Sequence, residues 1–214
     1  MLVGRRMTRN VITVTPDISI ADAMERMKRE KVRRFPVLDK NRKLIGIVTH
    51  DDLLHASPSS ATSLSIWEVS YLLSQVKVRE VMSKEVITVS EDTPLEDAAR
   101  LMVENKIGGL PVMRGEALVG IITESDLFKV FQELLSAQEK GVRLTVLAPY
   151  FKGSLAQISS AITEKGGLIL ALNTFMGEDS TNWGCHLKVA DISKEELLEV
   201  VEPLVVEIVD VREV

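Results

Sequence analysis

Apolar and polar positions follow two different periods along the first two-thirds of the chain, and the same succession of periods occurs twice. Each copy begins with the β-branched stretch VITV, at residues 11–14 and 86–89, which predicts a short strand. Apolar residues at i, i+3, i+4 and i+7 then predict an amphipathic helix. In the first copy this stripe consists of Ile20, Ala23, Met24 and Met27. Two apolar runs around a polar turn predict a hairpin, and a last helix follows, so each copy has the order β-α-β-β-α.

The two copies align when the sequence is shifted by 75 residues. MTRNVITV from Met7 then meets MSKEVITV from Met82, and the triplets FPV and LPV coincide. After the loss of one residue in the second hairpin turn, GIVTHDDLL (46–54) aligns with GIITESDLF (120–128). Self-similarity of this length indicates one structural unit used twice. One copy is too small to cover both faces of its sheet, so we expect the two to pack sheet against sheet as a pseudo-two-fold pair.

Capping motifs predict where the first helix of each copy begins. Ser19-x-x-Asp22 precedes the helix of the first copy. Thr93-Pro94-x-Glu96 in the second copy combines an N-cap, a proline at the first helical position and an acidic third residue.

Between the copies, the serine-rich linker HASPSSATSLS precedes a further predicted helix over residues 66–75. Ser65-x-x-Glu68 is its capping box. Its apolar stripe is Ile66, Val69, Leu72 and Leu73. Trp67 and Tyr71 share an adjacent face, and we expect the helix to cover the repeat pair or a second subunit.

From about residue 141 the chain no longer matches the repeat. Strands are predicted over residues 142–147, 168–174, 185–189 and 205–211. Helices follow at the capping motifs Ser154-x-x-Gln157 and Ser193-x-x-Glu196. The order β-α-β-β-α-β is the ferredoxin-like split βαβ pattern. The chain is therefore predicted to be an α+β protein, with the first repeat at 1–57, a linker and helix at 58–78, the second repeat at 79–138 and a third unit at 139–214.

Composition narrows the class of protein. Hydrophobic residues make up 45% and charged residues 27% of the chain, which is typical of a soluble globular protein. No apolar run approaches the ~20 residues that span a bilayer, and the N-terminus lacks the apolar core of a secretory signal. The single cysteine, Cys185, cannot form an internal disulfide, so we expect a reducing, cytoplasmic location. One cysteine and three histidines argue against a zinc site.

Charge is unevenly distributed along the chain. The net charge is −5, but residues 1–55 carry 12 Lys/Arg and 7 Asp/Glu, or +5, so the remainder, with 14 and 24, is at −10. The basic run RMKREKVRR at residues 26–34 is either a solvated helix face or a site for a small anion. Because no aromatic platform accompanies it, nucleic acid is not the partner we expect.

The motifs Thr49-x-x-Asp52 and Thr123-x-x-Asp126 stand where a strand meets a helix, and two interpretations are open. As capping boxes, they satisfy the first backbone groups of a helix. As ligand sites, the helix N-terminus offers N–H donors to a phosphate, and the carboxylate accepts both hydroxyls of a ribose. Both copies keep the hydroxyl and the acid although the residues between them differ, which favours a ligand.

Together these motifs resemble a tandem pair of cystathionine-β-synthase (CBS) domains, a Bateman module. The resemblance covers about residues 5–138 and implies two clefts between the repeats that bind adenosine compounds such as AMP, ADP, ATP or S-adenosylmethionine. The nucleotide-binding residues it implies are Thr15, Ile47, Thr49, Asp52, Ser90, Ile121, Thr123 and Asp126. The acids would bind the ribose hydroxyls, the motif threonines ribose or phosphate, and the isoleucines adenine, while Thr15 and Ser90 approach the nucleotide.

The resemblance also implies phosphate contacts from the two residues before the second strand's Phe-Pro-Val or Leu-Pro-Val. They are Arg33 and Arg34 in the first copy but Gly108 and Gly109 in the second. Paired guanidiniums chelate phosphate oxygens, whereas glycines leave space and backbone donors. We therefore predict two inequivalent sites, with a polyphosphate drawn towards the arginines. The alternative is that both arginines are merely exposed.

The third unit resembles an ACT domain, and the order CBS–CBS–ACT resembles the AcuB-like proteins, named for acetoin utilisation in bacteria. Ligand-binding ACT domains carry Asp-x-Pro-Gly between first strand and helix, whereas this chain has APYFKG, ending at Gly153. Gly153 would still permit close approach of an amino-acid carboxylate. Because the acid and the proline are missing, dimerisation is the role we expect of this unit.

These patterns favour a regulatory sensor: an adenine nucleotide binds the CBS pair, and the change passes through dimer or ACT contacts to a partner protein. The alternative is an amino-acid or small-acid sensor through the ACT-like unit, with the CBS pair mainly structural. The sequence has no nucleophile–base set, phosphate-cradling loop or metal cluster, so we expect neither an enzyme nor a resident cofactor. His50, His55 and His186 are scattered, and Cys185 and Trp183 are expected to be structural. A homodimer is expected from the resemblance.

Overall fold

The computed structural model of the chain describes residues 1–57, 65–177, 179 and 181–214. It divides into two compact units, residues 1–127 and 128–214. The predicted serine-rich linker falls largely in residues 58–64, outside the described part. The finer boundaries predicted from the sequence stay predictions.

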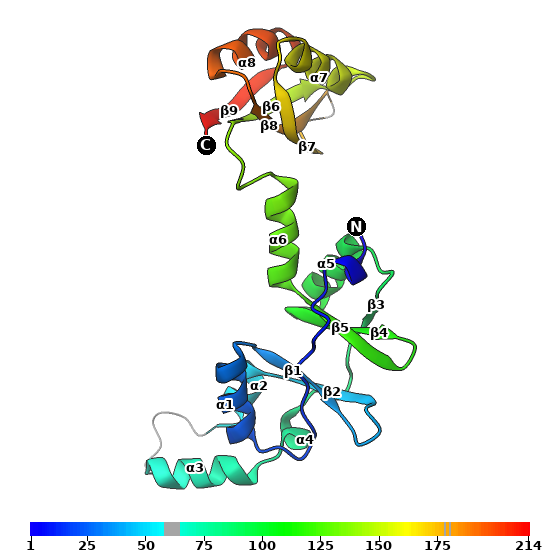
Figure 1. The fold of residues 1–214 in the computed structure, drawn as a ribbon, viewed down its shortest axis with the longest axis vertical. Helices are drawn as coiled ribbons and strands as arrows, with labels where there is room; N and C mark the ends of the chain where they lie inside the picture. Colours follow the sequence, from blue (N-terminus) through cyan, green and yellow to red (C-terminus); the bar gives the residue numbers. More distant parts are fainter. Residues whose placement is uncertain (58–64, 178, 180) are drawn as a thin grey trace. The chain divides into compact units, whose positions relative to one another are not determined.

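Both repeats lie in the first unit, apart from residues 128–134 of helix α6, and from their first helix onward they have the same succession of elements (Figure 1). The first repeat contains α1 (Ile20–Glu30), β1 (Arg34–Leu38), β2 (Leu44–Thr49) and α2 (His50–His55). The second contains β3 (Val89–Ser90), α5 (Leu95–Asn105), β4 (Gly109–Arg114), β5 (Ala117–Thr123) and α6 (Glu124–Leu134). The short helices η1 (Val3–Arg5) and α4 (Val78–Val81) precede the repeats.

The two hairpins have equivalent registers, which fixes the positions of the candidate site residues. Strand β1 pairs with β2 so that Arg34 faces Thr49. Strand β4 pairs with β5 so that Gly109 faces Thr123. The residue before each Phe-Pro-Val or Leu-Pro-Val triplet therefore lies directly across from the threonine of the Thr-x-x-Asp motif.

The first strand predicted for each repeat is shorter than expected. In the first repeat only Val14 pairs, forming a parallel bridge with Val37, and in the second the strand covers Val89–Ser90. The backbone explains the difference in the first repeat: the Val11 N–H bonds the Arg9 carbonyl in a tight turn, and Pro16 has no N–H to donate.

The segments at the start of the two repeats are exchanged between them. Thr8 pairs with Ile121 of the second repeat, and Ser83 pairs with Ile47 of the first. Glycines permit the close approach, since a Cβ on Gly46 would lie 2.5 Å from the Met82 Sδ. Gly120 lies equally closely against Met7. Each repeat is therefore completed by residues from the start of the other.

The predicted helix starts are confirmed in the first repeat and wrong by one residue in the second. The Ser19 Oγ accepts a hydrogen bond from the Asp22 N–H at 3.1 Å. Helix α5 instead begins at Leu95. Its N-cap residue is Pro94, whose side chain makes no capping hydrogen bond. The Thr93 hydroxyl is taken by an earlier turn, where it accepts the Ser90 N–H at 3.1 Å.

The connecting helix α3 has the predicted bounds, Ile66–Gln75, and the predicted capping box of Ser65 and Glu68. Leu73 packs on the hydrophobic core of the first repeat. Trp67 and Tyr71 are 85% and 66% exposed. The side chains of Ile66 and Val69, predicted for its apolar stripe, lie outside the described part of the chain.

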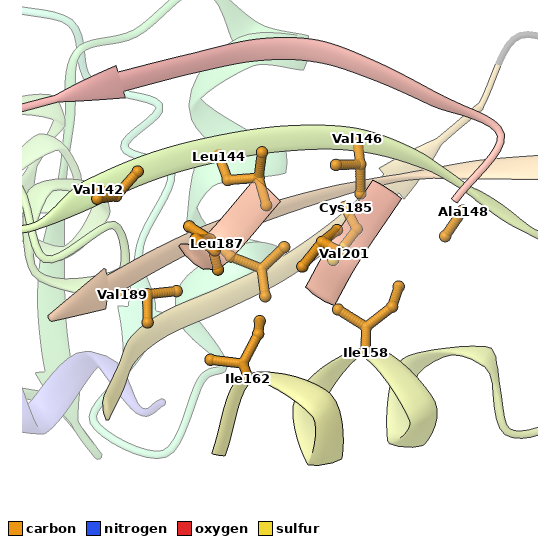
Figure 2. Close-up of a cluster of buried hydrophobic side chains, with 11 residues drawn as sticks. Val142, Leu144, Val146, Ala148, Ile158, Ile162, Cys185, Leu187, Val189 and Val201 are labelled. Atoms are coloured by element: carbon orange, nitrogen blue, oxygen red, sulfur yellow. The ribbon is translucent and has the colours of Figure 1, made fainter. Parts of the chain in front are cut away.

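The second unit has the predicted order β-α-β-β-α-β. Its elements are β6 (Val142–Pro149), α7 (Ser154–Glu164), β7 (Leu168–Met176), β8 (Asn182–Ala190), α8 (Lys194–Val201), η2 (Glu202–Leu204) and β9 (Glu207–Glu213). The strands form one antiparallel sheet in the order β7-β8-β6-β9, which is the ferredoxin-like order. Alternate residues of β6 and β8 face Ile158 and Ile162 of α7 and Val201 of α8 (Figure 2).

One predicted cap in this unit is wrong. Ser154 is the first residue of α7, and Gly153, at φ 99°, is the N-cap. A positive φ of this kind favours glycine. The Ser154 hydroxyl is buried and accepts the Trp183 Nε1–H at 3.3 Å. The cap predicted at Ser193 is confirmed as a capping box with Glu196.

Candidate functional site: a cleft between the two repeats

A cleft of about 950 Å³ lies between the repeats and is lined by residues of both. The first repeat contributes Arg33 and Arg34 before and at the start of β1, Ile47 and Thr49 of β2, and the first turns of α2. The second contributes Ser83, residues 85–87 and 106–109, and Glu124. Because the Ser83 segment pairs with Ile47, the exchange described above brings Ser83 and residues 85–87 to the cleft.

Thr49 and Asp52 form a capping box and also line the cleft. The Asp52 Oδ2 accepts the Thr49 N–H at 2.8 Å and the Thr49 hydroxyl at 2.7 Å. The Thr49 Oγ1 accepts the Asp52 N–H at 3.2 Å. Both bonds to the carboxylate end on one oxygen, Oδ2, so capping fixes the side chain without occupying Oδ1. The two interpretations open at the sequence level are compatible for this pair.

Apolar side chains are part of the cleft lining. Ile47 and Leu54 come from the first repeat, and Val86, Ile87 and Ile107 from the second. An apolar lining with a few polar groups is typical of small-molecule sites.

Arg34 reaches from the first repeat to the glycine pair of the second. A Cβ on Gly108 would lie 2.7 Å from the Arg34 Nη2, and one on Gly109 would overlap the Arg34 Nη1. Nη1 is buried and has no hydrogen-bond partner. Burial lowers the pKa of Arg34, and the negative charge of Glu124 opposes that shift. The guanidinium stays protonated, so it is a partly desolvated cation with donor capacity left over. Arg33 is exposed at the mouth of the cleft.

Sequence reasoning missed several polar and charged residues of the cleft, namely His50, Asp51, Glu85, Lys106 and Glu124. His50 and Glu124 were detectable, because each follows the threonine of a Thr-x-x-Asp motif. Glu85 and Lys106 gave no signal, since their approach depends on how the repeats pair.

In the second motif pair the threonine makes the same two hydrogen bonds to the carboxylate, but its residues do not line this cleft. The Thr123 hydroxyl donates to the Asp126 Oδ2 at 2.7 Å. Ile121 is 9% exposed, and its backbone pairs with Thr8. Ser90, whose backbone N–H bonds Thr93, also lies outside the lining.

Thr15, exposed between Val14 and Pro16, lies outside it as well. The structure thus gathers Arg33, Arg34, Ile47, Thr49 and Asp52 of the predicted set. It does not bring Thr15, Ser90, Ile121, Thr123 or Asp126 to the same cleft.

Two residues of the second unit with potentially reactive side chains, Cys185 and His186, lie on strand β8. Burial raises the pKa of Cys185 to about 11, so the thiol is protonated at neutral pH. Burial lowers the pKa of His186, whose Nδ1 lies 3.1 Å from the Thr145 hydroxyl. A Cβ on Gly153 would meet no atom within 4 Å, so space is open above this residue.

Within the described residues, no helix has the length and apolarity to cross a bilayer. In the same part of the chain, no three His, Cys, Asp or Glu side chains are grouped as ligands for a metal ion.

The model of the CBS domain matches residues 3–59 and 78–133, more than half of the chain. The chain belongs to the CBS-domain family. Its structure is similar to that of a Vibrio cholerae protein described as an acetoin utilization protein (AcuB), with 36% identity and a TM-score of 0.53 over 64% of this chain and 95% of that one. It also resembles CBSX2 in complex with AMP, at 34% identity and TM-score 0.53, over 62% and 97% of the two chains. The CBS pair of MJ0100, in complex with 5′-methylthioadenosine and S-adenosyl-L-methionine, matches at 28% identity and TM-score 0.52, over 65% and 98%.

Among curated relatives, inosine-5′-monophosphate dehydrogenase of Methanocaldococcus jannaschii is 33% identical over 141 residues. That match covers 65% of this chain but only 25% of the enzyme. The corresponding enzyme of Bifidobacterium longum is covered to 29% of its length. The chain therefore spans about a quarter of these relatives, and the similarity lies in their CBS region.

Proposed function

We propose that this protein is a regulatory sensor that binds an adenosine-containing ligand in the cleft between its CBS repeats. The observation that carries the proposal is that a carboxylate and a guanidinium line the same cavity. Asp52 presents a fixed carboxylate, and Arg34 presents a guanidinium with a buried, unpartnered Nη1.

Each part of such a ligand has a matching group in the cleft. The Asp52 carboxylate accepts hydrogen bonds from the vicinal hydroxyls of a ribose, as acidic residues do in dinucleotide folds. Ile47, Val86 and Ile87 offer an apolar surface to the adenine ring. Arg33 and Arg34 supply donors for a phosphate. The relatives solved with AMP and with S-adenosyl-L-methionine support this class of ligand.

The test is a thermal-shift and calorimetric screen of adenosine, AMP, ADP, ATP, S-adenosylmethionine and NADH against the full chain. A ligand present at 100 times its dissociation constant adds ~2.7 kcal/mol to the free energy of unfolding. Asp52→Asn should weaken binding on the order of tenfold to a hundredfold, because hydrogen bonds to a charged acceptor are lost.

Asp22→Asn is the matched control. Asp22 makes the same kind of bond, accepting the Ser19 hydroxyl at 2.7 Å, but it does not line the cleft. Both variants weaken a capping interaction, but only Asp52→Asn should weaken ligand binding. Silence across the panel, or equal effects of the two variants, would refute the proposal.

For the second unit we propose an ACT-like role in dimerisation and signal transmission to a partner protein, in a cytoplasmic homodimer of the AcuB type. The ferredoxin-like sheet order supports this proposal. Binding transmits a signal only through unequal affinity for two arrangements of the chain. Light scattering at micromolar concentration should give about twice the chain mass of 23.7 kDa; a monomer would contradict the dimer.

A further inference from the structure

The charges around the cleft are nearly balanced. Arg33, Arg34 and Lys106 are cationic, and Asp51, Asp52, Glu85 and Glu124 are anionic. A triphosphate brings three to four negative charges of its own, which three cations already faced by four carboxylates do not offset. The balance favours a ligand that carries little negative charge.

Glu124 is placed to act on the cation best suited to a phosphate. Its Oε2 lies 2.8 Å from the point where a Cβ of residue 108 would be, and the Arg34 Nη2 lies 2.7 Å from that same point. The carboxylate and the guanidinium therefore share the space that Gly108 leaves empty. Of the neighbouring charges, that of Glu124 has the largest effect on the pKa of Arg34.

The arrangement arises from a difference between the repeats. Glu124 follows Thr123 as His50 follows Thr49, and Gly108 and Gly109 stand where the first repeat has Arg33 and Arg34. The first repeat thus supplies the two arginines, and the second supplies the Glu124 carboxylate and the space in which Arg34 and Glu124 meet. Had the second repeat copied the first, a histidine would face the ligand in place of Glu124.

We propose that Glu124 sets the charge selectivity of the cleft by competing with ligand phosphate for Arg34. The ligand class is then an adenosine compound with at most one phosphate, and ADP and ATP are disfavoured. This inference rests on the proposed function and narrows it.

The experiment measures dissociation constants of adenosine, AMP and ATP by calorimetry for the full-length wild type and Glu124→Gln. Removing one like charge at about 4 Å across solvent is worth about fivefold in affinity. Glu124→Gln should therefore raise the affinity for AMP by about fivefold relative to adenosine, and the affinity for ATP by more. Adenosine, which has no phosphate, should bind as before.

Asp51→Asn is the matched control, because Asp51 is an exposed carboxylate of the same cleft, as Glu124 is, but it raises the pKa of Arg34 less than Glu124 does. Its effect on phosphate binding should therefore be clearly smaller. In an Arg34→Met background the Glu124→Gln effect should shrink, since a double-mutant cycle isolates coupling through Arg34. Glu124→His, which copies the first repeat, is a second variant expected to act in the same direction.

The outcomes separate the inference from the function on which it rests. If adenosine binds but Glu124→Gln and Glu124→His leave the ATP-to-adenosine affinity ratio as in wild type, the inference is wrong and the function stands. Equal effects of Glu124→Gln and Asp51→Asn also overturn it. If no adenosine compound binds the wild type, the proposed function fails, and the inference with it.

Discussion

At the scale of single residues, the cleft depends on the packing of the long Arg34 side chain against two glycines, Gly108 and Gly109. Arg34 occupies the volume above Gly108 and Gly109, and its Nη1 is left without a partner. An unpartnered buried donor costs about 1–3 kcal/mol unless a ligand or water accepts from it. A phosphate oxygen at this position would remove that cost, so we expect the glycine pair to affect ligand binding more than folding.

Gly109→Ala tests this relation. The added Cβ would overlap the Arg34 Nη1 and lie 3.1 Å from the Ile122 carbonyl oxygen. Because the far end of a flexible side chain can move, stability should fall by only about 1 kcal/mol. The displaced guanidinium should cost AMP about tenfold in affinity and leave adenosine nearly unchanged, as measured by calorimetry.

The double variant Arg34→Ala with Gly109→Ala provides the control. If displacement of Arg34 is the cause, the alanine at 109 should have little further effect on AMP once Arg34 is gone. Additive losses would show that the glycine matters for another reason.

At the scale of elements, capping motifs were reliable wherever the hydroxyl had no competing partner. Ser19, Thr49, Ser65 and Ser193 all cap as predicted. Thr93 and Ser154 do not, since Thr93 bonds the Ser90 turn and Ser154 bonds Trp183. The pattern of residues is the same in each case, and only the tertiary neighbours differ.

The exchanged segments could not be predicted from the sequence. Thr8 and Ile121 belong to different copies and are far apart along the chain, yet their N–H and C=O groups exchange bonds at 2.9 and 3.0 Å. Repeat alignment shows that the copies are equivalent, but it does not say which copy a preceding segment completes.

Met7→Ala tests the exchange. Met7 is 8% exposed and lies against Gly120 of the second repeat, so truncation should cost about 2–5 kcal/mol through the cavity it leaves. Hydrogen exchange should accelerate first at Ile121 and its neighbours in β5, although Met7 belongs to the first repeat in sequence. Met1→Ala, at a 51% exposed side chain, should leave the pattern unchanged; acceleration confined to the first repeat would contradict the exchange.

At the scale of the whole molecule, periodicity predicted the element order of both units, apart from the first strand of the first repeat, which is a single bridge at Val14. The repeated motifs carried the resemblance to the family. The repeat β-α-β-β-α and the order β-α-β-β-α-β were both present as apolar patterns. The residues that line the cleft could be predicted only in part. Arg34 and Asp52 belong to recognisable motifs, whereas Val86 and Ile87 were assigned to a strand and instead line the cavity.

The central claim is that one cleft between the repeats holds an adenosine compound, and a crystal structure of the chain with AMP tests it most directly. The account predicts the ribose hydroxyls within hydrogen-bond distance of the Asp52 carboxylate and the phosphate at the Arg34 guanidinium, with adenine against Ile47. AMP bound elsewhere, or a cleft in which Asp52 and Arg34 make no contact with it, would contradict the account.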